Sequence, residues 1–205
     1  MPFLVLDLEM TGGDPGWHEI VQLGAVLYDD NWIELGQYLT NVYPENEESV
    51  SDYAEKIHGL SLIDLDDAPM MHDVLPEFED WIIDKLHLRK MKREGQDNGH
   101  LLREVIICGQ SVINDINFLR FAYNSQDMKW VYSNKLLDTH TLGYFVFRIL
   151  KNNGQKVPEK LSLTAIASHF GFFREGTQHN ALEDAILTGK CFMEIYKIAD
   201  KLKLL

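Results

Sequence analysis

The chain has 205 residues, 45% of them apolar, and a formal net charge of −13 at pH 7. This length is ample for one hydrophobic core and too short for two, so we expect an α/β fold in a single domain over residues 1–205. No apolar segment approaches the roughly 18 residues of a membrane helix, and the N-terminus lacks a secretory signal pattern, so we expect a cytoplasmic protein without membrane contact.

The first predicted element is a buried strand that ends in two acids. Residues 3–8 form an apolar, branched run, and the turn-forming residues 10–16 follow at once. Asp7 and Glu9 share a face, because side chains two apart in a strand point the same way. Burying both is costly unless protons or cations neutralise them, and oxygen ligands favour magnesium, manganese or calcium. The alternative is one buried acid held by hydrogen bonds and another merely at the strand's end.

The next part of the chain predicts a hairpin and two helices. Two strands and then two helices are expected at residues 20–28, 32–40, 50–57 and 74–86. The hairpin turn is Asp29-Asp30-Asn31, and Pro76 lies near the start of the second helix. A basic cluster follows, made of Lys85, Arg89, Lys90, Lys92 and Arg93. A solvated helix end explains this cluster, and phosphate binding is the alternative.

A second strand, turn and helix places another acid. Residues 105–108 predict a strand and residues 112–123 a helix, with Asp115 in its first turn. A carboxylate there is favoured by the helix dipole, so capping alone is an alternative to metal binding.

The last third of the chain predicts three helices. Two of them cover residues 139–150 and 161–170, and the last opens at His179-Asn180-Ala181-Leu182-Glu183-Asp184 and continues through Ile198. A histidine at such a boundary is mobile enough to reach a substrate water, and the unperturbed histidine pKa of ~6.5 suits a general base. The alternatives are a surface cap for His179 and a solvated helix acid for Asp184.

Together these motifs resemble the DEDD 3′→5′ exonucleases in their histidine-bearing form, such as the proofreading subunit of bacterial DNA polymerase III, ribonuclease T and oligoribonuclease. The first motif is Leu6-Asp7-Leu8-Glu9-Met10-Thr11-Gly12 and the third is His179 to Ala185. The second motif, residues 109–119, departs from the family: Gln110 and Ser111 replace its usual histidine and asparagine, and Asn114 replaces an aromatic residue. Weaker similarities lie at residues 57–61 and 137–139, so the resemblance covers nearly the whole chain.

The resemblance implies a ribonuclease-H-like fold, with a mixed five-stranded sheet flanked by helices. It also implies two Mg²⁺ or Mn²⁺ ions, with Asp7 bridging both, Glu9 and Asp184 completing the inner one, and Asp115 holding the outer one. His179 would be the general base in hydrolysis that releases nucleoside 5′-monophosphates from 3′ ends of single-stranded DNA or RNA.

Family resemblance also suggests residues that contact the substrate: Thr11, Gly12, His58, Leu60 and Ser111. Leu60 is more often simply part of a core. The expected partner is a single-stranded 3′ end, and a homodimer or a polymerase partner is possible. The charge of −13 argues against tight, unaided binding of long duplexes and favours short substrates, a local basic patch or a partner that delivers the strand.

A catalytically weak exonuclease-like interaction module is the alternative function, because the second motif is altered. Asp7, Glu9, Asp115, Asp184 and His179 are all retained, and a binding module needs no such set. An enzyme is therefore favoured, while the choice between DNA and RNA stays open.

Overall fold

The computed structural model describes residues 1–88 and 99–202. Its five strands are β1 (Phe3–Met10), β2 (Ile20–Tyr28), β3 (Glu34–Asn41), β4 (Ile106–Gly109) and β5 (Leu136–Asp138). They form one sheet in the order β3-β2-β1-β4-β5. The first three strands are antiparallel, whereas β4 and β5 run parallel to β1. The predicted mixed five-stranded sheet is confirmed.

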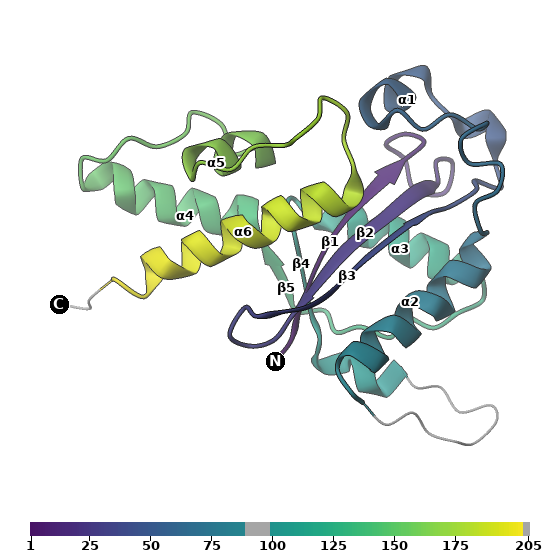
Figure 1. Ribbon diagram of the computed structural model, residues 1–205, viewed down its shortest axis with the longest axis horizontal. Coiled ribbons are helices and arrows are strands. Elements are labelled where there is room, and N and C mark those ends of the chain that lie inside the picture. The colour runs from purple at the N-terminus through teal and green to yellow at the C-terminus, as the bar shows by residue number, and fades with distance from the viewer. Residues whose placement is uncertain (89–98, 203–205) are drawn as a thin grey trace.

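Across residues 1–88 and 99–202, six α-helices surround this sheet: α1 (Asp52–His58), α2 (Met71–Lys85), α3 (Ile113–Ser125), α4 (Thr139–Asn152), α5 (Leu163–His169) and α6 (Ala181–Ala199). Two short 3-10 helices cover Glu47–Ser49 and Gly99–Glu104. Figure 1 shows α4, α5 and α6 on one side of the sheet, α2 and α3 on the other, and α1 beyond the end of β1. Within the described residues, no helix is long and apolar enough to cross a membrane.

The central strand β1 packs on both layers because its side chains alternate. Leu4, Leu6 and Leu8 join the core that α2 and α3 cover. Val5 packs in a separate cluster with Phe192 of α6. This alternation places Asp7 and Glu9 on the α6 face of β1, as their spacing predicts.

Several predicted boundaries are wrong by one to three residues. β3 begins at Glu34 rather than residue 32, because Trp32 has a positive φ of 60° and stacks on Phe3 instead of continuing a strand. α1 begins at Asp52, where the Ser51 side chain accepts a hydrogen bond from the Ala54 amide.

Two other helices differ from their predicted ranges. α2 begins earlier than predicted, at Met71, whose side chain is buried in the core, so Pro76 lies inside the helix. α5 is shorter than predicted, because Ser162 caps its first turn. Cys108 and Cys191 are both buried free thiols.

The basic cluster is only partly described. Lys85 is the last residue of α2 and is exposed. Arg89, Lys90, Lys92 and Arg93 lie outside the described residues, so a phosphate-binding role for them stays a prediction.

Candidate active site

Two carboxylates come from the end of β1. Opposite them in β2 stand Gly24, which pairs with Asp7, and Gln22, which pairs with Glu9. Glu9 is buried, at 7% exposure, and within the described part of the chain its Oε1 has no hydrogen-bond partner. A buried carboxylate oxygen without a partner is costly, so this atom is suited to a cation.

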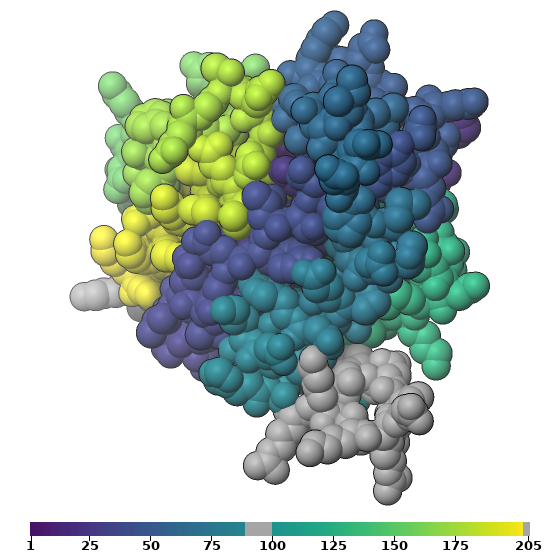
Figure 2. Space-filling view, turned by 45° about the vertical axis from the view of Figure 1, so that its right-hand side comes forward, coloured from purple at the N-terminus to yellow at the C-terminus, as the bar shows by residue number. Residues whose placement is uncertain are grey.

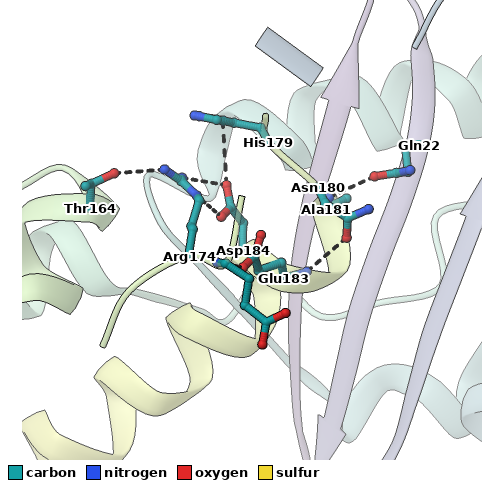
Figure 3. Close-up of polar contacts among 9 residues, drawn as sticks. Gln22, Thr164, Arg174, His179, Asn180, Ala181, Glu183 and Asp184 are labelled. Carbon is teal, nitrogen blue, oxygen red and sulfur yellow. Dashed lines mark hydrogen bonds and ion pairs between the residues drawn. The ribbon is translucent and has the colours of Figure 1, made fainter. Parts of the chain in front are cut away.

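The first turn of α6 brings a third carboxylate to the same place. An ideal Cβ on Gly24 would lie 2.2 Å from the backbone of Ala181 and Leu182, so only glycine allows α6 to approach β2 this closely. The Ala181 amide donates to the Gln22 side chain at 2.9 Å, and Asn180 caps the helix by accepting from the Glu183 amide. Figure 3 shows these contacts at the start of α6. They bring Asp184 near Asp7 and Glu9, whose pKa values its charge raises.

Asp184 is paired with a residue that the motifs did not indicate. The Arg174 guanidinium donates to both Asp184 oxygens, at 2.5 and 2.7 Å, and also to the Thr164 hydroxyl at 2.9 Å (Figure 3). Both charged side chains are largely buried, with 15% and 4% exposed. The available sequence signal is that Arg174 is the only lysine or arginine between residues 161 and 189.

The fourth carboxylate, Asp115, reaches β1 from the other layer. Its Oδ1 accepts a hydrogen bond from the Leu8 amide at 3.1 Å, and its side chain is buried. Asp115 lies in the first turn of α3, and its bond to the Leu8 amide shows that its side chain contacts β1 as well as its own helix.

His179 lies in the segment before α6, at the junction with α1. Its amide donates to the Ile57 carbonyl at 2.9 Å, which ties this segment to α1. Its Nδ1 is 3.6 Å from an Asp184 oxygen, and 41% of the side chain is exposed. In Figure 2 a little of the purple N-terminal segment is visible between the yellow-green start of α6 and the blue region around α1. His179 is therefore both fixed by the fold and accessible to solvent.

Burial and mutual repulsion make the negative charges of the carboxylates in this cluster unfavourable. Burial, followed by the charges of Asp115 and Asp184, raises the pKa of Asp7 well above its usual range. Burial raises the pKa of Glu9 to about 8 and that of Asp115 to about 7. Burial, and then the charge of Arg174, lowers the pKa of His179, so the imidazole is neutral near pH 7.

The cluster fits a hard divalent cation. One oxygen each of Glu9 and Asp184 and one nitrogen of His179 lie within 4.8 Å of one another. The carboxylate oxygens of this set, together with the unpaired Glu9 oxygen and the raised pKa of Glu9, suit magnesium or manganese, and the His179 nitrogen lies beside them. Asp7 and Asp115 adjoin the set, through β1 and through the Leu8 amide, without sharing that 4.8 Å spacing.

Two predicted substrate contacts lie just beyond β1. The Thr11 hydroxyl is buried, shares a hydrogen bond with Ser49 and accepts one from the Glu19 amide, so it braces the turn. The His18 ring lies against Gly12, where an ideal Cβ would be only 2.1 Å from it. His18 was not indicated by the motifs. The substrate roles of Thr11 and Gly12 stay predictions.

The remaining predicted contacts lie on two sides of the site. His58 is buried at the end of α1, where its Nδ1 accepts from the Leu60 amide, and Leu60 itself is half-buried. Ser111 has a positive φ of 53°, and its amide donates to Asp138. Their contacts with a substrate stay predictions.

Gln110, one of the three altered residues of the second motif, links separate parts of the fold. Its side-chain amide donates to the Leu161 carbonyl at 2.8 Å and accepts from the Thr139 hydroxyl at 2.5 Å. It therefore joins the end of β4 to α4 and to the segment before α5. This explains the departure at residue 110 by a contact far away in sequence.

Comparisons with known proteins identify the family of this chain. The RNase_T exonuclease family model matches residues 4–192. The DNA polymerase III subunit epsilon of Aquifex aeolicus is 32% identical over 193 residues, covering 94% of this chain and 79% of that protein. A DNA polymerase III PolC-type of Thermotoga maritima is 28% identical over 98% of this chain, which spans only 12% of that protein.

Solved structures share the fold. The nuclease domain of 3'hExo, described as a DEDDh family member bound to rAMP, has a TM-score of 0.71 at 19% identity, covering 100% of this chain and 94% of that one. E. coli Exonuclease I in complex with a 5cy-dT13 oligonucleotide has a TM-score of 0.74 at 15% identity, covering 97% and 42%.

Proposed function

Because this chain belongs to the DEDDh family of 3′→5′ exonucleases, we propose that it removes nucleoside 5′-monophosphates one at a time from single-stranded 3′ ends. The observation that carries this proposal is the meeting of Asp7, Glu9, Asp115 and Asp184 beside an accessible, neutral His179. An interaction module has no use for buried acids such as Asp7 and Glu9, whose pKa values are raised by burial and then by the charges of neighbouring carboxylates.

The proposed cofactors are two Mg²⁺ or Mn²⁺ ions. Exonucleases of this family generally use divalent metal ions. Asp7, Glu9 and Asp184 would hold one ion, and Asp7 with Asp115 the other. Bound ions supply stabilisation of the attacking and leaving oxygens of the phosphodiester. Support comes from the unpaired Glu9 oxygen and from the raised pKa values of Glu9 and Asp115. Such raised values mean that the negative charges are costly unless protons or cations neutralise them.

His179 is the proposed general base. Its Nδ1 lies toward Asp184, which leaves Nε2 to take a proton from the attacking water. The lowered pKa keeps the ring neutral and able to accept that proton. The bond to the Ile57 carbonyl holds the backbone of His179, so the ring is positioned while its edge stays accessible.

We propose DNA as the substrate because of what the curated relatives are. The curated relatives are DNA polymerase III proteins, which also supports a polymerase partner and a cytosolic location. Solved structures with this fold include one that recognises a histone mRNA stem-loop, so RNA is the necessary comparison. A second copy of this chain, in a homodimer, is the other partner that we propose.

The test is mononucleotide release from 3′-labelled and 5′-labelled single-stranded DNA and RNA with Mg²⁺ or Mn²⁺. Asp7→Asn is the matched control, because it keeps the shape of the side chain and removes its charge. Shortening by one nucleotide from the 3′ end, abolished by EDTA and by Asp7→Asn, is the expected result. Absence of turnover on every substrate would favour the interaction module instead.

A further inference from the structure

One segment has a charge opposite to that of the whole chain. Residues 139–160 contain four cations, Arg148, Lys151, Lys156 and Lys160, and one acid, Glu159, a formal charge of +3 within a chain of −13. All four cations are exposed, and none forms an ion pair with any described residue. Their charge is therefore available to an external anion.

This segment forms an open groove along α4. Tyr144, Arg148 and Lys151 are spaced by four and three residues, so they lie on one face of the helix. They line a groove of about 430 Å³, whose other wall is formed by Val157, Pro158, Glu159 and Leu161. Tyr144 is 63% exposed, although nothing in the core requires a large aromatic residue there. An exposed aromatic ring beside unpaired cations is the combination that binds single-stranded nucleic acid.

The groove is linked to the catalytic cluster through hydrogen bonds around residues 161–164. Leu161, at its edge, accepts the hydrogen bond from Gln110, and three residues further on Thr164 accepts from Arg174, the partner of Asp184. In Figure 1, α4 runs outward beside α6, and the chain returns along it to α5. A strand whose 3′ end lies at the carboxylates can therefore continue along α4.

We propose that the α4 groove, defined by Tyr144, Arg148, Lys151 and the wall at residues 157–161, binds the upstream nucleotides of a single-stranded substrate. Arg148 and Lys151 meet phosphates, and the Tyr144 ring stacks on a base. This inference rests on the proposed exonuclease function and extends it to a second contact region. It also resolves the conflict between a net charge of −13 and a nucleic-acid substrate, because the cations are concentrated where the strand lies.

The test compares a long oligothymidylate with a thymidine dinucleotide, which is too short to reach the groove. The groove variants are Arg148→Gln/Lys151→Gln and Tyr144→Ala. Each has a matched control: Lys197→Gln/Lys201→Gln removes two exposed cations at the C-terminal end of α6, of which Lys197 is paired with Glu194, and Phe145→Ala removes an equally exposed ring beside Tyr144. All four changes are on exposed side chains, so folding is retained.

The measured quantity is kcat/KM on the long substrate divided by that on the dinucleotide. We expect each groove variant to lower this ratio about tenfold and each control to leave it unaltered. For the double charge variant, the slope of log(kcat/KM) against log salt should fall by about 1.4, since each lost phosphate contact on a single strand removes about 0.7. An unaltered ratio, or an equal loss in the controls, would overturn the groove while leaving the exonuclease in place.

Binding separates the two proposals. Fluorescence anisotropy with labelled oligothymidylate should show weaker binding by the groove variants. If no turnover is found on any substrate but this loss of binding is seen, the exonuclease is refuted and the groove is retained. Displacement of the oligonucleotide by polyglutamate at equal charge concentration would instead identify the groove as a site for an acidic protein partner.

Discussion

Replacing Arg174 with glutamine should destabilise the protein strongly in EDTA and only weakly in Mg²⁺. The guanidinium is the cation that contacts both Asp184 oxygens, and the two side chains are only 15% and 4% exposed. Removing one partner of such a pair leaves an unpaired buried charge, which costs about 3 kcal/mol or more. In a chain of this length, each kcal/mol lowers the melting temperature by roughly 2–4 °C, so the expected loss in EDTA is about 6–12 °C.

A bound divalent ion can replace the lost positive charge, so Mg²⁺ should restore most of this stability. Differential scanning calorimetry at pH 8, with and without Mg²⁺, measures both values. Thr164→Val is the matched control: it removes the neutral hydrogen bond to Arg174, which contributes about 1 kcal/mol, and its effect should not depend on metal. An equal loss for Arg174→Gln in EDTA and in Mg²⁺ would show that Asp184 is not part of a cation site.

Three further outcomes are expected. His179→Ala should keep metal binding, measured by calorimetry, and lose about 10²–10⁴-fold in mononucleotide release; unchanged turnover would remove the histidine from the mechanism. In EDTA, the free energy of unfolding should fall as pH rises from about 4.5 to 8. The pKa of Glu9 is raised from 4.5 to about 8, so Glu9 binds more protons in the folded state than in the unfolded state, and Asp115 acts in the same direction. A free energy of unfolding that rises over this pH interval would contradict the buried cluster. Gly24→Ala should cost about 1–3 kcal/mol in urea unfolding and reduce turnover, because the new methyl group meets the backbone of Ala181; wild-type values for both would mean that the close approach is dispensable.

Sequence patterns predicted those parts of the site that local structure determines. The alternation along β1 placed Asp7 and Glu9 on one face, and the start of α6 placed His179 before the helix and Asp184 inside it. These positions follow from periodicity and turn signals, which act over a few residues. Four of the strands and the helices were predictable for the same reason, whereas β5 was indicated only by family resemblance at residues 137–139.

The contacts that assemble the site could not be predicted in this way. Arg174 reaches Asp184 only because the segment before α6 folds back, and Gln110 is explained only by its bond to Leu161. The start of β3 was misplaced because Trp32 leaves the strand to stack in an aromatic cluster. Each of these depends on tertiary packing, which local propensity does not contain.

The hydrogen bond from the Ala181 amide to Gln22 joins residues 159 positions apart. It belongs to the contact that seats α6 against β2 and carries Asp184 to the acids of β1. A ribosome that has made β1, β2 and β3 has therefore made a chain in which the acids of β1 have no Asp184 or His179 beside them. On the proposed mechanism, we expect no cutting of nucleic acid by a nascent chain or a fragment until α6 is present.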